Sequence, residues 1–401
     1  MGMPIACEYG KDCFISSLFS YEETQEESPE KLIRDYKCGR LTQAGEKSTR
    51  FALRNIQQID EGVDVIAVDK GTVEAVHDGE KDIGASKANK TKIPTTNNNC
   101  GNGVIIRHGR GFLTQYCHLQ QGSLAVEVGQ EVKKGDPLGK VGSSGTVSYP
   151  HLEFIVKRDN TAIDPFTGEG ITSCTQKKDF ISLWDFKTDA MLSYVPTLLI
   201  NASFTANIPN AEGVNNGRFI TSNLTNDEDR IVFWVNLMGL QKDDILEISI
   251  TSPRGKTIAL REKAFSRYEP FYFHYVGKRK SGAAWERGKY IGNVSLSRLK
   301  EDTAEQQIKD KNSKTTKDNL GRTTKVSKNP GKKNGAEKLE LPEELPASNA
   351  EEHPNIEKTT DEKSAPIDFE EELLESAVPG KAPLPDDRFM VIDSNVELIV
   401  E

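Results

Sequence analysis

Residues 100–166 read CGNGVIIRHGRGFLTQYCHLQQGSLAVEVGQEVKKGDPLGKVGSSGTVSYPHLEFIVKRDNTAIDPF. The stretch consists of short runs of β-branched and aromatic residues that end at glycines, and the same pattern begins upstream at Gly62. Short runs bounded by turn residues are typical of strands. An all-β domain is therefore expected, with strands at Val63–Val68, Thr72–Val76, Val104–Arg107, Phe112–Tyr116, Leu124–Val128 and Leu152–Val156.

A hairpin is expected in the middle of this stretch, because two of the runs flank the turn His108-Gly109-Arg110-Gly111. Its two glycines can take the positive φ angles of a tight turn. The hairpin would bring Cys100 and Cys117 to nearly opposite places on adjoining strands, which makes them the best-placed pair for a disulfide. Sequence alone leaves the connectivity of the six cysteines open.

All six cysteines lie within the first 174 residues. An even number confined to one module favours disulfides and an oxidising compartment, and the alternative is a set of buried free thiols. The chain of 401 residues is 36% hydrophobic and 28% charged, so it can bury one or two cores but not its whole length. We expect two folded domains and a disordered segment, and place the first domain at residues 1–190.

The remainder divides into a second β block and a charged tail. Residues 196–300 contain alternating runs separated by turn residues, which predict a small β-sandwich; these runs are RIVFWVNL (230–237), ILEISI (245–250), PFYFHY (270–275) and YIGNVSL (290–296). Residues 301–335 carry nine basic and five acidic side chains, and residues 336–401 carry five basic and nineteen acidic ones. Residues 301–401 are therefore predicted to be mostly disordered. Within them, Ile367–Ala377 could form a short amphipathic helix, and Phe389–Val400 is apolar enough to dock as a strand.

Composition also excludes several classes of protein. No apolar run reaches the roughly 18 residues of a membrane-spanning helix. Met1–Gly10 lacks the basic and then apolar pattern of a signal peptide, so either the chain stays inside the cell or a leader is missing here. The net charge of −9 argues against nucleic acid as the main partner.

Three motifs in residues 100–166 resemble the lysostaphin-type zinc metallopeptidases, cell-wall endopeptidases that cut peptide cross-bridges. The family's aromatic-x-His-Leu motif is present as Tyr116-Cys117-His118-Leu119, and its Pro-His-Leu-His-Phe strand as Pro150-His151-Leu152-Glu153-Phe154. Asp164-Pro165-Phe166 matches the end of the family pattern. The glycine spacing also fits, at Gly122, Gly129, Gly135, Gly139, Gly142 and Gly145. The resemblance covers about residues 36–170 and implies the β-rich duplicated-hybrid-motif fold.

The resemblance also implies which positions should hold zinc. Family members bind it through a His and an Asp of a Gly-His-x-Gly-x-Asp element and through the second His of His-x-His. At these positions this chain has Glu46, Arg50 and Glu153. The two histidines that assist the metal-bound water in the family are retained here as His118 and His151.

Arg50 is the decisive change, because an arginine stays protonated and offers only hydrogen-bond donors. Its charge would repel a divalent cation a few ångströms away by several kcal/mol even at an effective dielectric constant near 20. We therefore expect no metal or other cofactor, and a salt bridge of Glu46, Arg50 and Glu153 in place of zinc. His118 and His151 would then serve in hydrogen bonding, in ligand contact or, least expected, in catalysis. Glu46 and Arg50 could instead be ordinary solvated loop charges.

The leading prediction is a catalytically inactive homologue of these peptidases. It would be a periplasmic or secreted binding or regulatory module whose partner is peptidoglycan, a peptide or an envelope protein. The first alternative is an active metalloendopeptidase that cleaves peptidoglycan peptides and holds zinc through an atypical set drawn from His118, His151, Glu46 and Glu153. The second alternative is a structural or adhesive surface protein in which the sandwich and the tail matter most.

Overall fold

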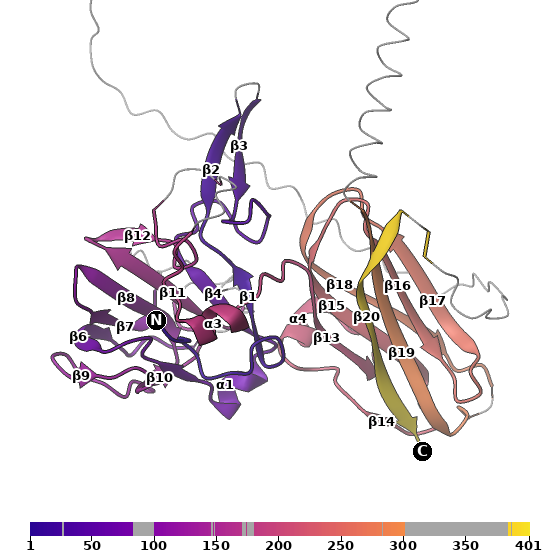
Figure 1. Ribbon diagram of the computed structural model, residues 1–401. Coiled ribbons are helices and arrows are strands. Elements are labelled where there is room, and N and C mark those ends of the chain that lie inside the picture. Colours follow the sequence, from indigo (N-terminus) through magenta and orange to yellow (C-terminus); the bar gives the residue numbers. More distant parts are fainter. Residues whose placement is uncertain are drawn as a thin grey trace, which may run out of the picture. The chain divides into compact units, whose positions relative to one another are not determined.

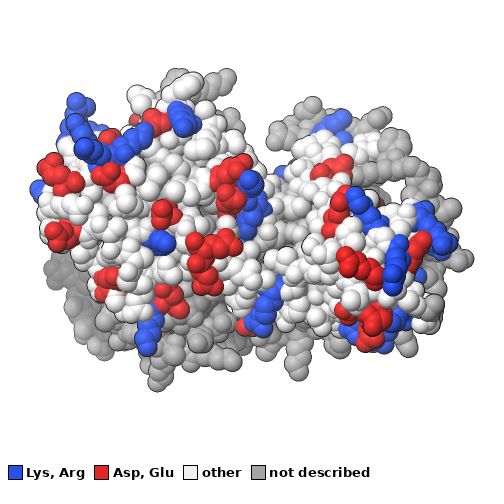
Figure 2. Space-filling view, turned by 90° about the horizontal axis from the view of Figure 1, so that it is seen from below, with Lys and Arg blue, Asp and Glu red and all other residues white. Residues whose placement is uncertain are grey.

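The computed structural model describes residues 1–25, 28–82, 100–145, 147, 149–170, 174, 180–282, 284–300, 384–385 and 387–401 (Figure 1). The regular structure is mainly β, as predicted, with several antiparallel sheets. The helices within the described residues are three and short: α1 (Gln57–Glu61), α3 (Phe186–Met191) and α4 (Ala211–Asn215). No helix among the described residues is both long and apolar enough to cross a membrane. Acidic and basic side chains alternate over the face seen in Figure 2.

The N-terminal half is built on an eight-stranded sheet. Its strands run in the order β1-β4-β11-β8-β7-β6-β9, and β12 also pairs with β11. Two smaller sheets pair β10 with β5 and β2 with β3. The strand bounds are β1 Cys13–Ser17, β2 Tyr21–Gln25, β3 Ser28–Arg34, β4 Thr49–Leu53, β5 Asp64–Ile66, β6 Gly71–His77, β7 Asn102–Arg107, β8 Phe112–Leu119, β9 Glu131–Val132, β10 Pro137–Lys140, β11 His151–Arg158 and β12 Thr161–Ile163.

The predicted hairpin is confirmed, because β7 and β8 pair antiparallel with Val104 opposite Tyr116. Of the two turn glycines, only Gly111 has a positive φ, of 77°. The second residue with a positive φ in this turn is Arg110, at 62°, rather than Gly109.

The strand predicted at Leu124–Val128 is wrong. This segment forms no ladder, and one of its few backbone bonds runs from Ala125 N to Leu138 O, at 3.0 Å. Leu124 and Val126 pack against the core, so their alternation reflects burial rather than strand pairing. The short strands β9 and β10, which follow this segment, were not predicted.

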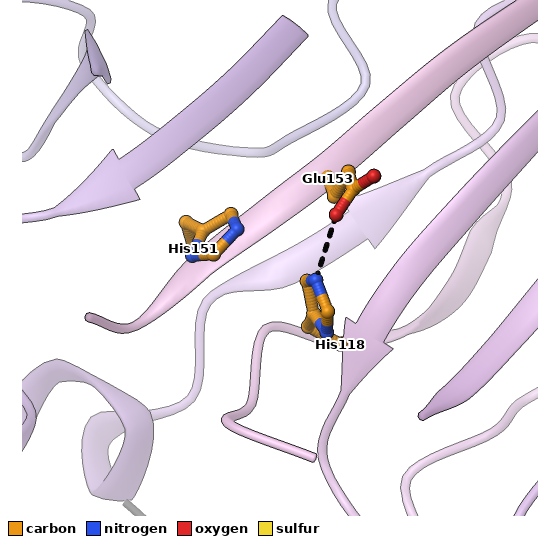
Figure 3. A group of neighbouring side chains, drawn as sticks. All are labelled: His118, His151 and Glu153. Atoms are coloured by element: carbon orange, nitrogen blue, oxygen red, sulfur yellow. Dashed lines mark hydrogen bonds and ion pairs between the residues drawn. The ribbon is translucent and has the colours of Figure 1, made fainter. Parts of the chain in front are cut away.

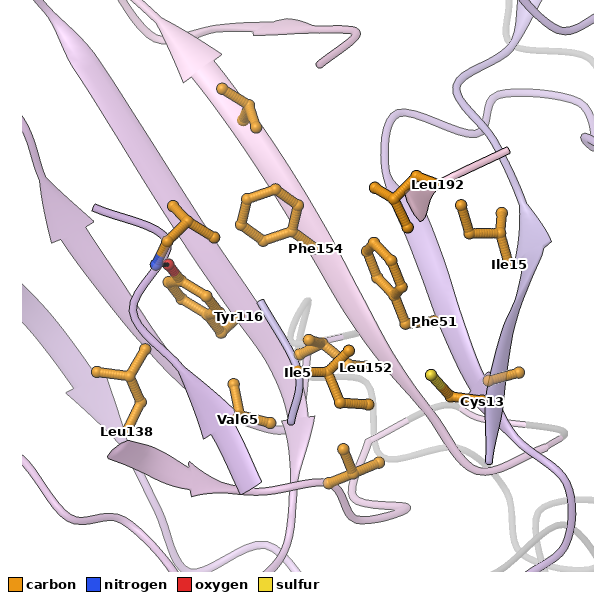
Figure 4. Close-up of a cluster of buried hydrophobic side chains, with 14 of the residues drawn as sticks. Ile5, Cys13, Ile15, Phe51, Val65, Tyr116, Leu138, Leu152, Phe154 and Leu192 are labelled. Atoms are coloured by element: carbon orange, nitrogen blue, oxygen red, sulfur yellow. Dashed lines mark hydrogen bonds between the residues drawn. The ribbon is translucent and has the colours of Figure 1, made fainter. Parts of the chain in front are cut away.

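A hydrophobic core fixes the orientation of β11. Leu152, Phe154 and Val156 are all buried in it, with Tyr116 of β8 and Phe51 of β4 as neighbours (Figure 4). Side chains alternate between the two faces of a strand. The residues that alternate with these core positions along β11, among them His151 and Glu153, therefore face the opposite side of the sheet.

Three disulfides link all six cysteines: Cys7–Cys13, Cys38–Cys174 and Cys100–Cys117. The third is the pair expected from the hairpin. This disulfide links Cys100, the first described residue after Asp82, to Cys117 of β8, which directly precedes His118.

The C-terminal half contains two further sheets. A three-stranded sheet has the order β13-β15-β18 and a five-stranded sheet the order β14-β20-β19-β16-β17. Side chains from both sheets share one hydrophobic cluster. The four strands predicted at residues 230–296 are present, and the bounds are β13 Leu198–Thr205, β14 Asn223–Leu224, β15 Arg230–Leu240, β16 Ile245–Thr251, β17 Thr257–Ala264, β18 Glu269–Arg279, β19 Gly288–Leu299 and β20 Arg388–Val400.

Strand β20 corrects the predicted boundary between the second domain and the tail. The sequence assigned residues 301–401 to a mostly disordered tail, but β20 lies between β14 and β19 and pairs with β19 along its whole length. Ile392, Leu398 and Val400 are buried in the shared cluster, which confirms the prediction that Phe389–Val400 docks as a strand. The five-stranded sheet therefore includes the strand at the end of the chain. The helix considered at Ile367–Ala377 lies outside the described residues.

Candidate functional site

The candidate site lies where β4, β11 and β8 run side by side. Glu153 of β11 is directly opposite Arg50 of β4 on one side and Cys117 of β8 on the other. His118 follows Cys117, and His151 precedes Glu153 by two residues on the same face. Figure 3 shows the three polar side chains converging, and the rings of His118 and His151 lie 4.8 Å apart between centroids.

His118 is held in place by its backbone and by its ring. The residue is buried and has a φ of 66°, in the left-handed region that non-glycine residues seldom occupy. Its backbone N–H donates to Cys100 O at 2.8 Å, and its carbonyl accepts from Gly142 N at 2.9 Å. The ring places Nδ1 2.9 Å from Ser144 O and Nε2 2.9 Å from Glu153 Oε2. Backbone strain of this kind is concentrated at functional sites and is held there by surrounding structure.

His151 is buried and has one ring partner. Its Nδ1 donates to Tyr149 O at 2.6 Å, whereas Nε2 is buried without a hydrogen-bond partner. Burial, together with the charges of His118 and Arg50, lowers the pKa of His151 to about 3. The ring is therefore neutral at physiological pH.

Glu153 is paired with His118 rather than with Arg50. Burial alone would raise the pKa of this carboxyl group, but the hydrogen-bonded His118 ring and the nearby Arg50 charge hold the pKa below its ordinary value. Glu153 therefore carries a negative charge within a largely enclosed site.

Glu46 and Arg50 form a separate ion pair. Arg50 Nε lies 2.8 Å from Glu46 Oε2, although the two atoms are not aligned as a hydrogen bond. Glu46 is 3% exposed at its side chain and also accepts from Ser48 N at 3.1 Å and from Gln43 Nε2 at 3.2 Å. The salt bridge expected among Glu46, Arg50 and Glu153 is therefore not formed as a single group. Arg50 pairs with Glu46, whereas Glu153 pairs with His118 of β8.

The three positions that the resemblance assigns to zinc ligands, Glu46, Arg50 and Glu153, carry side chains that do not suit a metal ion. One of the three is an arginine, which cannot donate a lone pair, and it is already paired with the glutamate at a second position. The carboxylate at the third position faces His118 instead. A different set of potential ligand atoms does converge, in which Glu153 is joined by His118 and His151, and the three atoms all lie within 4.8 Å of one another.

Two backbone carbonyls that orient the histidines were not anticipated from the sequence. The carbonyl of Ser144 contacts the His118 ring, and its hydroxyl donates to Leu119 O at 2.7 Å. Tyr149 supplies the carbonyl that orients His151. Every residue has a backbone carbonyl, so the identity of a residue does not show whether its carbonyl accepts a side-chain hydrogen bond. Only the neighbouring histidine motifs could have indicated these two acceptors.

A pocket of about 400 Å³ lies at the other end of β8, away from these histidines. Its lining includes Lys70, His108, Arg110 and Thr114. The His108 ring is engaged there by Lys70 O and Thr114 Oγ1, both at 2.8 Å.

Comparison with known proteins agrees with the site's strand motifs. Residues 58–165 match peptidase family M23, a match that begins after Glu46 and Arg50. The peptidoglycan DD-endopeptidase ShyC of Vibrio cholerae is 45% identical over 58 residues, which are 14% of this chain and 13% of ShyC. The murein hydrolase activator EnvC of Escherichia coli is 39% identical over 62 residues, 16% of this chain and 14% of EnvC.

Among solved structures, the catalytic domain of the antimicrobial peptidase lysostaphin from Staphylococcus simulans is 25% identical. The match covers 30% of this chain and 75% of that domain, with a TM-score of 0.22. The chain thus spans only a small part of the length of the curated relatives named above. The family match and the retained histidine motifs agree on one assignment: residues 58–165 form a domain of peptidase family M23, the lysostaphin-type metallopeptidases.

Proposed function

We propose that this chain is a binding or regulatory module of the bacterial envelope and does not hydrolyse peptides with the family's zinc set. The observation that carries the proposal is the ion pair between Arg50 and Glu46, the residues that the resemblance assigns to two of the three family ligand positions. A metal ion there would have to displace a buried carboxylate from its counter-charge and then lie beside a fixed guanidinium.

Two further observations support a role at the envelope. The three disulfides are of the kind that persists in oxidising compartments, which favours a periplasmic or secreted protein. One relative of the M23 domain is named as an activator of murein hydrolases and another as an endopeptidase, so similar domains are found in both roles. The partner would be peptidoglycan, a peptide derived from it, or an envelope protein.

The test combines binding and hydrolysis on one substrate. The purified chain is mixed with peptidoglycan sacculi, with and without added Zn²⁺. Sedimentation of the chain with the sacculi and chromatography of released muropeptides are then measured. We expect co-sedimentation without release of cleaved peptides. Release that disappears in His151→Gln would overturn the proposal.

A second function is favoured by one observation, the convergence of His118, His151 and Glu153. If these residues held a catalytic zinc ion, the chain would be an active endopeptidase with an atypical site. The same release experiment separates the two functions, because the binding module yields no cleaved peptide at any zinc concentration.

A further inference from the structure

We infer that His118, His151 and Glu153 form a binding site for one divalent transition-metal ion, with Zn²⁺ as the best-matched ion. The site differs from the family's zinc site, with which it shares only the position of Glu153. Its three potential ligand atoms come from two adjacent strands and lie within 4.8 Å of one another. This inference does not depend on the proposed function.

The first argument is the tautomer that the backbone imposes on both rings. His118 Nδ1 lies 2.9 Å from Ser144 O, and His151 Nδ1 lies 2.6 Å from Tyr149 O. A carbonyl oxygen can only accept, so each Nδ1 carries the hydrogen, and each neutral ring presents a lone pair at Nε2. Histidines that bind metals almost always donate their second ring N–H in this way.

The second argument is an unsatisfied acceptor. His151 is 5% exposed, and its Nε2 is buried with no hydrogen-bond partner among the described residues. Buried polar atoms are nearly always paired, and an exception calls for a ligand, an ion or a water. His151 Nε2 is one of the three converging ligand atoms. Because it is an acceptor, the group that it lacks is a proton donor or a cation, and not another acceptor.

The third argument is that a metal ion would satisfy more of the three converging atoms than a proton would. His118 Nε2 and Glu153 Oε2 are 2.9 Å apart, and because Nδ1 already donates to Ser144 O, the hydrogen bond between them requires a second proton on the ring, at Nε2. A proton between them satisfies this pair but leaves His151 Nε2 alone. A metal ion satisfies all three atoms at once.

The donor types indicate which ion is bound. Two imidazole nitrogens and one carboxylate oxygen form a set typical of zinc, whereas Mg²⁺ and Ca²⁺ prefer oxygen ligands only. Donors on tetrahedral zinc lie roughly 3.3 Å apart, given bonds of about 2.0–2.2 Å. Binding is therefore expected to draw the His151 ring toward the His118–Glu153 pair. The Arg50 charge is offset by Glu46, which leaves Glu153 to attract the cation.

Metal held in this way would leave neither histidine free to assist an attacking water. Both imidazoles that serve this purpose in the family would be ligands here. The site is therefore compatible with zinc binding without hydrolysis, as a clamp between β8 and β11.

The test is a zinc titration of the full chain, prepared without a histidine tag and stripped with chelator. Calorimetry measures affinity and stoichiometry, Co²⁺ substitution reports coordination through its visible absorption bands, and the thermal midpoint reports folding. We expect one Zn²⁺ per chain and a rise in midpoint. Glu153→Gln, which keeps the shape of the side chain, and His151→Gln should each weaken binding by more than about 100-fold, since even residues behind the ligands contribute 10- to 100-fold.

The matched control is His77→Gln, which removes an exposed histidine of β6 and should bind zinc as the wild type does. Each variant must keep the wild-type midpoint in chelator; a variant that does not is replaced by the other ligand variant. Absence of zinc binding in the wild type, or binding in Glu153→Gln and His151→Gln as tight as in the wild type, overturns the inference. Zinc binding without muropeptide release supports it together with the proposed function, whereas binding with release supports it and overturns the proposed function alone.

Discussion

The two walls of the candidate site differ in what they retain of the family pattern. The wall formed by β8 and β11 lies inside the family match, keeps both histidines and holds each ring against a backbone carbonyl. The wall formed by β4 and the residues just before it lies outside the match and carries the Glu46–Arg50 ion pair. The β8–β11 wall thus keeps the family's two histidines with their backbone acceptors, whereas the neighbouring β4 wall carries a self-neutralising ion pair at the two positions that the resemblance assigns to zinc ligands.

The largest expected effect comes from restoring the β4 wall. The triple variant Glu46→His, Arg50→Asp and Glu153→His should bind zinc through the three family positions, with affinity measured by calorimetry. The comparison is sharpened by adding His118→Gln. This change should leave zinc bound in the triple variant, where His118 is not a ligand, but remove it from the wild type, where we propose that it is. If His118→Gln abolishes zinc binding in both the wild type and the triple variant, the three family positions and the set of His118, His151 and Glu153 are not separate zinc sites.

The next effect concerns the β8–β11 wall alone. Gly142 donates its N–H to His118 O, and a Cβ at this position would lie 2.5 Å from Gln120 Cα. Gly142→Val should therefore destabilise the fold by about 3 kcal/mol, because the backbone that supports His118 has no room to yield. Chemical denaturation measures the loss, and Gly129→Ala serves as a control for a glycine with open space around its Cβ position. That control also has a positive φ, of 88°, so its cost should come from the backbone alone, at about 1 kcal/mol. Equal losses in the two variants would contradict the assigned role of Gly142.

The next prediction concerns how the stability of the fold depends on pH through Asp164, which lies at the C-terminal end of the family match. Burial raises the pKa of Asp164 to about 6, although hydrogen bonds from Tyr21 and from the backbone of Phe166 oppose the rise. The folded state therefore binds this proton more tightly than the unfolded state, whose carboxyl group titrates near 3.8. The stability that this proton contributes is fully present below about pH 4 and is lost as the pH rises through 6, by about 3 kcal/mol in all. The His151 ring titrates with the opposite sign, so the quantity to measure is the difference in unfolding free energy between wild type and Asp164→Asn from pH 4 to pH 7. A constant difference would show that Asp164 is not held protonated.

A smaller effect is expected from the β4 wall. Arg50→Ala leaves the Glu46 carboxylate buried without its counter-charge. Because the Arg50 side chain is 27% exposed, solvent and the Gln43 and Ser48 donors compensate part of the loss, and we expect about 1–2 kcal/mol of destabilisation. Adding Glu46→Gln to Arg50→Ala should restore most of it, and thermal unfolding measures both. If Glu46→Gln gives no recovery, the ion pair is not what stabilises this wall.

The sequence predicted those features of the site that depend on local periodicity. Alternation along β11 puts Leu152 and Phe154 in the core, which already implies that His151 and Glu153 share the other face. It could not predict that Glu153 pairs with His118 rather than with Arg50. Arg50 and Cys117 are both directly opposite Glu153, so strand register leaves the choice open. The choice depends on the left-handed backbone of His118, which turns its ring toward β11, and on Glu46, which already engages Arg50.

The same distinction applies to the end of the chain. The apolar character of Phe389–Val400 indicates a strand, but the acidic composition of residues 336–401 as a whole predicts disorder, because composition is an average over a long segment. Pairing with β19 depends on residues about one hundred positions away. An average over the whole tail therefore hides a single strand that pairs with a sheet formed by residues far away in the sequence.

The smallest expected effect on the site comes from the tail. Removing residues 301–401, as the sequence alone would suggest, also deletes β20 and should unfold the second domain. The better variant joins Lys300 to Asp387 by a short linker, since Lys300 N donates to Asp387 O at 2.8 Å and the two ends are already adjacent. Because this variant leaves β4, β8 and β11 intact, zinc affinity and binding to sacculi should both stay within about two-fold of wild type, well below the tenfold that 1.4 kcal/mol represents. Loss of binding to sacculi with zinc affinity unchanged would move the partner from the two walls to the removed segment, and would favour the structural or adhesive alternative over a site-based module.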